Sequence, residues 1–274
     1  MLKKIKKVFI IAEIGLNHNG NLNQAYKLIR SAAKAGADAV KFQTYITEKR
    51  AKKDSPIFDI LKECELNFSD FLLLKKYAES QNVYFFSTPF DLESVDYLLS
   101  NIKTKLIKIA SFDSENDELI KRILKYKTDI IMSLGLTNLN KIDKKIKQIS
   151  KKRNLALLHC ITSYPIKDKE ANLNSIHFLK NKYDNIIGYS DHSKSIILPS
   201  IAVAAGAKII EKHYMINKND KCVDSGVSVS EKEFKEMIKQ IRYTEDILGK
   251  HSNQIRENEK KFLFLKRKKI INPV

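Results

Sequence analysis

Short apolar runs alternate with longer amphipathic stretches along most of the chain. The runs are rich in Ile, Val and Phe, and the stretches between them, such as "NLNQAYKLIRSAAKAG", repeat apolar residues every three or four positions. This pattern is typical of buried strands followed by surface helices. We predict eight strands, at Val8–Gly15, Ala39–Tyr45, Val83–Pro89, Leu106–Ser111, Asp129–Gly135, Leu155–Thr162, Ile186–His192 and Lys208–Tyr214.

The regular alternation predicts an α/β fold, a single (β/α)8 TIM barrel. An open doubly wound sheet is the alternative, but eight units of even spacing favour closure. Gly36 and Gly206 are expected to end helices and lead into the next strand. Ser230 and Glu233 form a capping box at the start of the last helix, which should end at Gly249.

The chain length of 274 residues suits one barrel. We assign residues 1–250 to it. Residues 251–274 are basic, polar and weakly patterned, and predict a linker-like or docking tail. The start, "MLKKIKKVFIIAEIG", is superficially like a signal peptide, but it lacks a small-residue cleavage site and runs directly into the regular pattern.

Composition indicates the cellular compartment and limits the kinds of binding partner to expect. No apolar run reaches the ~20 residues that span a bilayer, and the cysteines Cys64, Cys160 and Cys222 are scattered, which favours a reducing cytoplasm. The formal net charge of +18 suggests nucleic-acid binding. However, lysine greatly outnumbers arginine, the lysines lie mostly on predicted helices, and no nucleic-acid motif is present. We expect a solvated basic surface that attracts an anionic substrate, with no nucleic-acid or membrane partner.

Polar residues gather at the carboxyl ends of the predicted strands. Parallel strands are covered on both faces, so their middles should be apolar, and barrel active sites lie at the carboxyl ends. One such strand end could arise by chance, but eight around one rim indicate a site. The residues are Glu13, Lys41, Gln43, Ser87, Thr88, Lys108, Ser111, Ser133, His159, Thr162, Ser190, Asp191, His192, Glu211 and His213.

Lys41 and Lys108 predict a phosphate-binding site. Each lysine alone could be a strand-end side chain that reaches solvent, but lysines supply charge and neighbouring hydroxyls supply neutral donors for an oxyanion. No GxxxxGK[ST] or GxGxxG motif is present, so a nucleotide P-loop is not expected. The hydroxyls concerned are those of Thr88, Ser111, Ser133 and Ser190.

His192 and His213 end adjacent predicted strands and are candidates for joint ligation of one divalent metal. Two imidazoles with water and substrate oxygens suit Mn²⁺, Co²⁺ or Fe²⁺, whereas Zn²⁺ more often has three protein ligands. Either histidine could instead be a hydrogen-bonded structural residue. His159 could be a core histidine, and His177 and His251 are expected at the surface.

Strand parity assigns roles to the remaining charged residues. Glu211 shares a face with His213, so it could orient a ligand or take up a proton, whereas Lys212 should point outward toward helices and solvent and matter least to the chemistry. Glu13 is the other acid/base candidate, with a partly exposed structural carboxylate as its alternative.

Six motifs, in order between about Val8 and Gly249, resemble the sialic acid synthase family, which includes the N-acetylneuraminate, legionaminate and pseudaminate synthases. They are "AEIGLNHNG", "AGADAVKFQTY", "STPFD", "LLHCITSYP", "GYSDHS" and "AAGAKIIEKHY". The resemblance implies a β/α barrel that condenses phosphoenolpyruvate with an open-chain N-acetylated amino sugar, giving a nine-carbon α-keto acid and phosphate. It also implies a homodimer and a divalent metal, Mn²⁺ with Mg²⁺ or Co²⁺ as alternatives.

The resemblance also implies residue roles. His192 and His213 would hold the metal, and Glu13, Asp113 and Glu211 would form the catalytic group. Within the substrate group, Tyr164 and Asp224 are placed at the sugar or the reacting centre by the resemblance alone. The full substrate-binding group is Lys41, Gln43, Thr88, Lys108, Ser111, Ser133, Thr162, Tyr164, Ser190 and Asp224.

The sequence departs from the family pattern in several places. Asp113 replaces the usual Glu, which shortens its reach by one methylene, and Thr162 stands where some members have Asn. "KIASF", "EANL" and "VDSGVS" are similar to the pseudaminic branch, while "AEIGLNHNG" and "KFQTY" are similar to the neuraminic and legionaminic branches, so the sugar stays open.

Family members usually continue into an antifreeze-like domain whose arginine reaches the partner subunit's active site. Here "FLKRKKIINPV" stands where that domain would begin. A shortened gene, one piece of a split enzyme and a natural single-domain form all remain open. The alternative function is therefore a degenerate or split barrel that binds phosphoenolpyruvate or a partner subunit without turnover.

Overall fold

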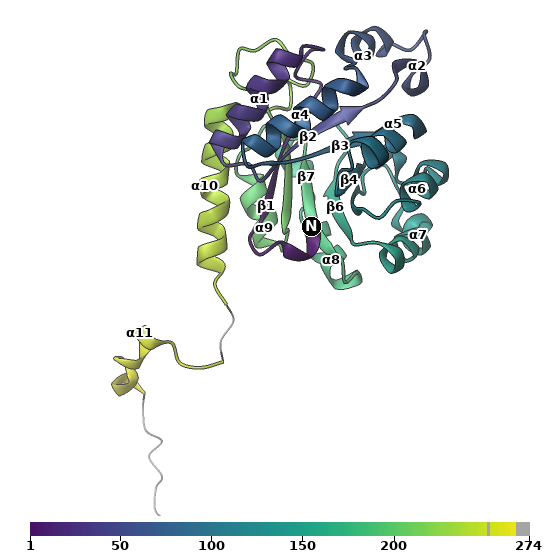
Figure 1. The fold of residues 1–274 in the computed structure, drawn as a ribbon. Coiled ribbons are helices and arrows are strands. Elements are labelled where there is room, and N and C mark those ends of the chain that lie inside the picture. The colour runs from purple at the N-terminus through teal and green to yellow at the C-terminus, as the bar shows by residue number, and fades with distance from the viewer. Residues whose placement is uncertain (251–252, 267–274) are drawn as a thin grey trace, which may run out of the picture.

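The computed structural model describes residues 1–250 and 253–266, and this part of the chain contains one parallel eight-stranded sheet. Its hydrogen-bonded order is β3-β2-β1-β8-β7-β6-β5-β4. The end strands β3 and β4 contact each other and complete the barrel (Figure 1), which confirms the predicted (β/α)8 fold. The strands are β1 Phe9–Gly15, β2 Ala39–Thr44, β3 Tyr84–Pro89, β4 Leu106–Ile109, β5 Asp129–Ser133, β6 Leu155–Cys160, β7 Ile186–Asp191 and β8 Ile209–His213.

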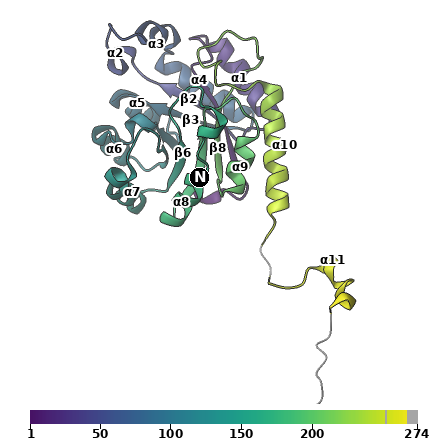
Figure 2. The ribbon, with the colours of Figure 1, turned by 180° about the vertical axis from the view of Figure 1, so that it is seen from behind.

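Helices surround the barrel on its outer side (Figures 1 and 2). Helix α10 begins at the predicted capping box of Ser230 and Glu233 and is followed by Gly249, and α1 ends at Gly36 in the left-handed conformation, both as predicted. Gly206 also adopts a left-handed φ, one residue after the C-cap Ala205 of α9. The helices are α1 Leu22–Ala35, α2 Thr47–Arg50, α3 Phe58–Cys64, α4 Phe68–Ser80, α5 Leu92–Asp96, α6 Asp117–Leu124, α7 Leu139–Lys152, α8 Asn174–Lys182, α9 Leu198–Ala204, α10 Glu231–Leu248 and α11 Glu257–Lys260.

The predicted strands are correct in number and order but overshoot at the rim. Ser111 lies in a 3₁₀ turn after β4, Gly135 and Thr162 lie in loops, and His192 directly follows β7. Rim residues such as Glu13, Lys41 and Lys108 lie within their strands, whereas the four residues just named lie on the first turns beyond the ladder. Their backbones are therefore set by loop contacts as well as by the sheet.

Strand alternation separates two apolar cores. Phe9, Ile11 and Ile209 belong to the core inside the barrel, whereas Ile10 and Ile210 belong to the core between strands and helices. A side chain at Gly188 would collide with the Ile209 carbonyl, because a Cβ there would lie 2.5 Å from that oxygen. The inside of the barrel is thus packed with apolar side chains below the rim.

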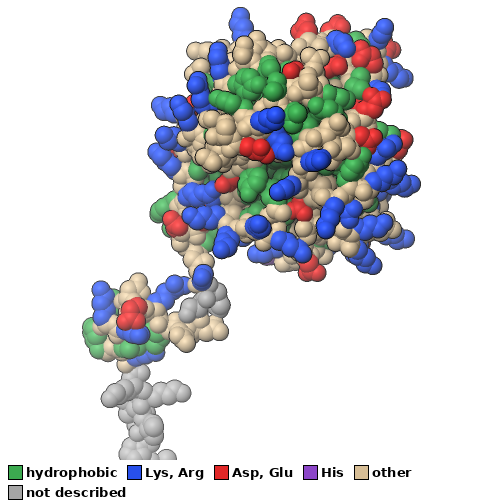
Figure 3. Space-filling model, in the orientation of Figure 1, with side chains coloured by type: hydrophobic (Ala, Val, Ile, Leu, Met, Phe, Trp, Pro, Cys, Tyr) green, Lys and Arg blue, Asp and Glu red, His purple; other side chains and the backbone are tan. Residues whose placement is uncertain are grey.

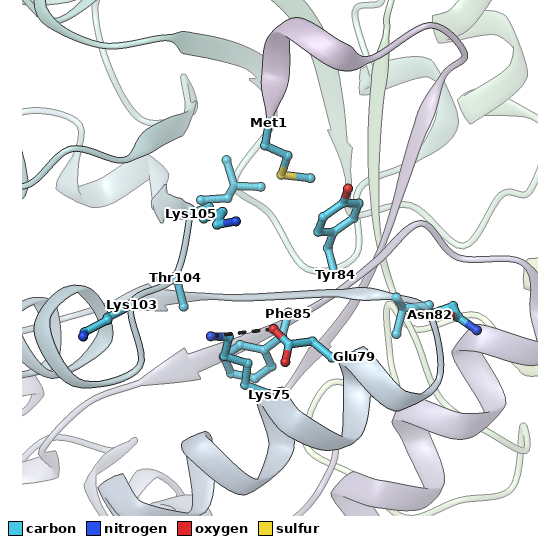
Figure 4. Close-up of a pocket in the computed structure, with 11 residues that line it drawn as sticks. Met1, Lys75, Glu79, Asn82, Tyr84, Phe85, Lys103, Thr104 and Lys105 are labelled. Atoms are coloured by element: carbon cyan, nitrogen blue, oxygen red, sulfur yellow. Dashed lines mark ion pairs between the residues drawn. The ribbon is translucent and has the colours of Figure 1, made fainter.

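The opposite end of the barrel is closed by the first residues of the chain. Leu2 is buried in the inner core, and the Met1 amino group donates to Asp129 Oδ2 at 2.6 Å. A cavity of about 340 Å³ lies there beside the first residues of β3 and β4, between Tyr84 and Lys105 (Figure 4). The ion pair drawn in it joins Lys75 Nζ and Glu79 Oε1 at 3.6 Å, and both of these side chains are partly exposed, unlike the buried charges at the rim.

Lysine and arginine side chains are scattered over the visible face of the barrel with acidic side chains among them (Figure 3). In the described part of the chain, no helix is long and apolar enough to cross a membrane. Of the predicted 251–274 tail, α11 lies away from the barrel (Figure 2), while residues 251–252, which include His251, and 267–274 lie outside the described residues. His177 is exposed, as predicted.

Candidate active site

A cavity of about 340 Å³ opens at the carboxyl ends of the strands and contains most of the predicted site residues. All eight strands, or the loops that follow them, contribute to its wall. Predicted residues that line it are Glu13, Lys41, Gln43, Thr88, Lys108, Ser111, Ser133, Tyr164, Ser190, His192, Glu211, His213 and Asp224. The structure therefore brings together residues that are up to 211 positions apart in the sequence, from Glu13 to Asp224.

Two lysines and two glutamates form a compact group at the base of this cavity, which we call the rim charge cluster: Glu13, Lys41, Lys108 and Glu211. Lys41 Nζ lies 2.8 Å from Glu13 Oε2 and 3.8 Å from Glu211 Oε1, and Lys108 Nζ lies 3.1 Å from the same Glu211 oxygen. All four residues are at most 5% exposed. Glu13 is thus fully buried, which rules out the alternative of a partly exposed structural carboxylate.

The rim charge cluster shifts the pKa of each member. Burial lowers the pKa of Lys41, but Glu13 and Glu211 raise it by more, whereas burial dominates for Lys108 and holds its pKa below the usual range. Burial raises the pKa of Glu13 against the opposing effect of Lys41. Burial also acts to raise the pKa of Glu211, but Lys108 and Lys41 hold it well below its usual range. Glu13 is therefore the better proton acceptor, and Glu211 stays ionised as the partner of the lysines.

The predicted hydroxyls surround this cluster. Lys41 Nζ donates to Thr88 Oγ1 at 3.1 Å, and Ser190 Oγ donates to Glu211 Oε1 at 3.0 Å. Ser111 Oγ accepts from the Gly135 amide at 3.1 Å. The buried Ser133 Oγ and Glu211 Oε2 have no hydrogen-bond partner among the described residues. Because buried polar atoms are normally paired, these two atoms indicate that a ligand or water belongs in the cavity.

The two predicted metal-binding histidines lie side by side at the ends of β7 and β8. Their ring centroids are 5.6 Å apart, and the Tyr164 ring lies 4.2 Å from that of His192. His192 Nδ1 donates to the Ile161 carbonyl at 2.9 Å, which leaves Nε2 free as a ligand atom. Asp224 Oδ2 lies 3.4 Å from His213 Nδ1, and His213 lowers the pKa of Asp224 against the effect of burial.

This donor set fits a divalent cation that takes further ligands from substrate and water. Within the described residues, no group of three or more His, Cys, Asp or Glu side chains is placed to hold a metal ion, so the protein would supply at most two ligands. His213 Nδ1 makes no short hydrogen bond in the described structure, and its nearest acidic neighbour is Asp224 at 3.4 Å. Two imidazoles with water and substrate oxygens suit Mn²⁺ or Co²⁺ better than a closed structural Zn²⁺ site.

Two predicted site residues do not line the cavity. Asp113 accepts a hydrogen bond from Asn116 Nδ2 at 3.0 Å, and burial raises its pKa. Thr162 Oγ1 lies 3.9 Å from Cys160 Sγ, and a Cβ at Gly135 would come within 2.3 Å of the same Thr162 oxygen. Neither Asp113 nor Thr162 lines the cavity, and the catalytic and substrate roles assigned to them stay predictions.

The structure also places residues in the cavity that the sequence did not single out. Arg50, at the end of α2, stacks its guanidinium 3.7 Å from the Phe90 ring centroid, and its Nη1 is buried without a hydrogen-bond partner among the described residues. Cys160 lies 3.8 Å from His192 Nδ1. In the sequence Arg50 stands in "TEKRAKK", where it is indistinguishable from solvated basic residues. Only the packing of α2 against the rim reveals it.

His159 and Lys212 lie outside the cavity. His159 Nε2 donates to the Ala171 carbonyl at 2.7 Å and its ring stacks on Tyr189, which makes it a core histidine. Lys212 points away from the barrel interior as predicted, but the expectation that it reaches solvent is wrong. Its side chain is 0% exposed and pairs with Asp191, because α8 and α9 cover this side of the sheet.

Comparison with known proteins identifies the family of this chain. The family model described as "NeuB family" matches residues 28–253. The chain belongs to the NeuB family. Its motifs at Lys41, Lys108, His192 and His213 all lie within the matched range, so the resemblance to sialic acid synthases is confirmed.

Several relatives of this NeuB-family chain are named as synthases of legionaminic acid, pseudaminic acid or N-acetylneuraminate 9-phosphate. The chain is 38% identical over 285 residues to an N,N'-diacetyllegionaminic acid synthase of Campylobacter jejuni, covering 97% of this chain and 85% of that protein. It is 34% identical over 260 residues to a pseudaminic acid synthase of the same species, covering 89% and 76%. A crystal structure of the N-acetylneuraminic acid synthetase of Leptospira borgpetersenii superposes with a TM-score of 0.91 at 38% identity, covering 95% of this chain and 91% of that chain.

Proposed function

We propose that this NeuB-family protein condenses phosphoenolpyruvate with an open-chain N-acetylated amino sugar, giving a nine-carbon α-keto acid and inorganic phosphate. The observation that carries this proposal is the rim charge cluster. Two buried lysines with hydroxyls around them suit a small dianion, and unpartnered buried atoms lie in the same cavity. The names of the relatives support a sialic-type product, and the cavity supports an anionic co-substrate.

The lysines would bind and orient the enolpyruvate. In the ligand-free structure Lys41 and Lys108 are engaged with Glu13 and Glu211. An arriving phosphate group would share these lysines, with Ser133 Oγ as a free neutral donor. Because Lys41 would then bind the phosphate, Glu13 would lose part of the interaction that keeps it ionised, and its pKa would rise further toward that of a general base.

The reaction then needs two bond-forming events and one cleavage. The methylene carbon of the enolpyruvate attacks the aldehyde carbon, whose oxygen takes up a proton. Water adds to the resulting oxocarbenium carbon, and Glu13 accepts the proton that this water gives up. The tetrahedral intermediate collapses with cleavage of the C–O bond to phosphate, and its hydroxyl proton leaves with the phosphate, which gives the keto group. The proton that Glu13 accepts from water balances the one taken up by the aldehyde oxygen.

The outer part of the cavity would hold the acceptor sugar. His192 and His213 are the residues that would hold a divalent cation, Mn²⁺ with Mg²⁺ or Co²⁺ as alternatives, and Asp224 lies beside His213. When bound, such a cation supplies Lewis-acid polarisation of the aldehyde. Arg50 carries an open N–H donor into this region, and we assign it to an oxygen of the sugar.

The proposal is tested by measuring phosphate release from phosphoenolpyruvate with Mn²⁺ and a panel of 2-acetamido and 2,4-diacetamido hexoses. We expect release that requires both the metal and one of these sugars. Calorimetry with phosphoenolpyruvate alone separates the alternative: binding without release across the whole panel, with folding confirmed, would support a degenerate barrel and contradict the proposed reaction.

A further inference from the structure

A second pair of buried charges lies directly behind the two histidines, on the outer face of the sheet. Lys212 Nζ and Asp191 Oδ2 are 2.7 Å apart, and both side chains are 0% exposed. We call Lys212 and Asp191 the outer ion pair. Neither residue lines the cavity, so neither touches substrate, and neither has a role in the proposed reaction.

The outer ion pair holds the backbone on both sides of His192. Asp191 Oδ1 accepts from the Ser193 amide at 2.9 Å and from the Tyr189 hydroxyl at 3.1 Å. Lys212 Nζ also donates to the Ser193 carbonyl at 2.6 Å. His192 is therefore enclosed by contacts to the residues immediately before and after it.

The position of the pair in the sheet is equally specific. The register between β7 and β8 ends where Asp191 lies opposite Lys212. The next residue on each strand is His192 and His213, beyond the last registered pair. Side-chain contacts thus continue the connection between the strands at the point where the ladder stops, and they do so one residue before each proposed ligand.

We propose that the outer ion pair is a positioning device that sets the separation and orientation of the His192 and His213 rings. The proposal rests on the proposed function in that these rings hold the cation. An apolar pair would bury a similar area, but apolar contacts are not directional and tolerate small shifts in the positions of the two strands. An ion pair with additional hydrogen bonds fixes one arrangement, even where it adds little net stability.

Two variants separate positioning from folding. Asp191→Asn keeps the shape but removes the charge, and the double variant Asp191→Leu with Lys212→Met replaces the pair by apolar side chains, a change that often preserves stability. Ile210→Val is the matched control. It removes one buried methyl group from the same outward face of β8, two residues before Lys212.

The first measurement is Mn²⁺ binding by calorimetry, alongside thermal unfolding of each protein. We expect both pair variants to bind Mn²⁺ about 10- to 100-fold more weakly, the range typical when residues that orient metal ligands are lost, while Ile210→Val binds like the wild type. Unchanged affinity in the folded double variant would overturn the proposal, and so would an equal loss in Ile210→Val.

The second measurement does not depend on the metal. Ring-nitrogen NMR signals of His192 and His213, recorded without metal at one fixed pH, should shift or broaden in the pair variants and stay in place in Ile210→Val. If the wild type failed to bind Mn²⁺, the proposed metal role would fall, and these signals alone would decide the positioning role. Ring signals identical to those of the wild type would overturn it.

Discussion

The rim charge cluster and the outer ion pair are both buried, and they lie on opposite faces of the same sheet. They differ in whether all of their polar atoms have a hydrogen-bond partner. Lys212 has a carboxylate and a carbonyl within 2.7 Å, and Asp191 uses both oxygens. At the rim, Glu211 Oε2 and Ser133 Oγ have no hydrogen bond in the described structure. We interpret a buried charged group whose polar atoms are all paired as part of the structural framework. We interpret a buried charged group with unpaired polar atoms as a ligand-binding group. We therefore expect substitutions in the outer ion pair to lower stability most, and substitutions at the rim to lower activity most.

The largest expected effect is on the outer face. Lys212→Met should lower the free energy of unfolding by roughly 3–5 kcal/mol, because it leaves the Asp191 carboxylate buried without its partner. Urea denaturation of the variant and the wild type measures this. A loss below about 1 kcal/mol would contradict the structural role that distinguishes the outer ion pair from the rim charge cluster.

A third buried group, His18, tests an ionisable side chain that has no ion pair among the described residues, although its Nδ1 accepts from the Gly20 amide at 3.1 Å. Burial lowers its pKa to about 4, against opposing effects of Asp224 and the Gly15 carbonyl, and its Nε2 has no hydrogen bond in the described structure. The unfolded chain takes up this proton near pH 6.5, but the folded chain does so only near pH 4. Stability from His18 is therefore complete above pH 6.5 and is lost as the pH falls toward 4, by about 3 kcal/mol.

Urea denaturation at pH 7 and pH 4, compared between the wild type and His18→Gln, isolates this contribution because the carboxylates titrate in both proteins. We expect the wild type to lose more stability than the variant over this interval. Equal losses would show that His18 is protonated in the fold, as a partnered group would be.

At the rim we expect a substitution to reduce activity more than it reduces stability. Lys108→Met should reduce kcat/KM by roughly 10- to 150-fold, corresponding to ~1.5–3 kcal/mol for a charged hydrogen bond. Unfolding free energy should change far less than in Lys212→Met, because Glu211 keeps Lys41 and Ser190 as partners. Steady-state kinetics with urea denaturation checks both. A variant that lost stability but kept its activity would contradict the assignment of this lysine to the substrate.

The smallest effect should come from the mouth of the cavity. Arg50→Met should raise the KM for the acceptor sugar about fivefold, which corresponds to ~1 kcal/mol for one hydrogen bond, and leave the KM for phosphoenolpyruvate unchanged. Lys49→Met is the matched control, since Lys49 lies on the same helix and pairs with Glu93 at the surface. Equal changes in the two KM values would place Arg50 at the phosphate instead.

The sequence predicted the fold well because periodicity reports burial. All eight strands were located, and the polar residues at their ends were placed on one rim, since in a parallel barrel every carboxyl end faces the same side. Parity also separated Glu211 and His213 from Lys212. These features depend on local pattern and on one topological rule.

Other features depend on tertiary packing and could not be predicted in this way. Parity shows that Lys212 points outward, but only the helices that cover the sheet decide that it is buried and paired with Asp191. Arg50 becomes a cavity residue because α2 folds back over Phe90. Thr162 is absent from the cavity lining because the chain leaves the ladder after β6 and turns beside Gly135.

The alternation within β8 has a consequence for protein engineering. Glu211 and His213 contribute to the cavity while Lys212, between them, holds β8 to the end of β7. Grafting the inward-facing residues onto another barrel would therefore transfer the donors without the frame that orients them. A transplant of this site should carry both faces of β7 and β8 together, and directed evolution of the sugar specificity should leave Asp191 and Lys212 unvaried.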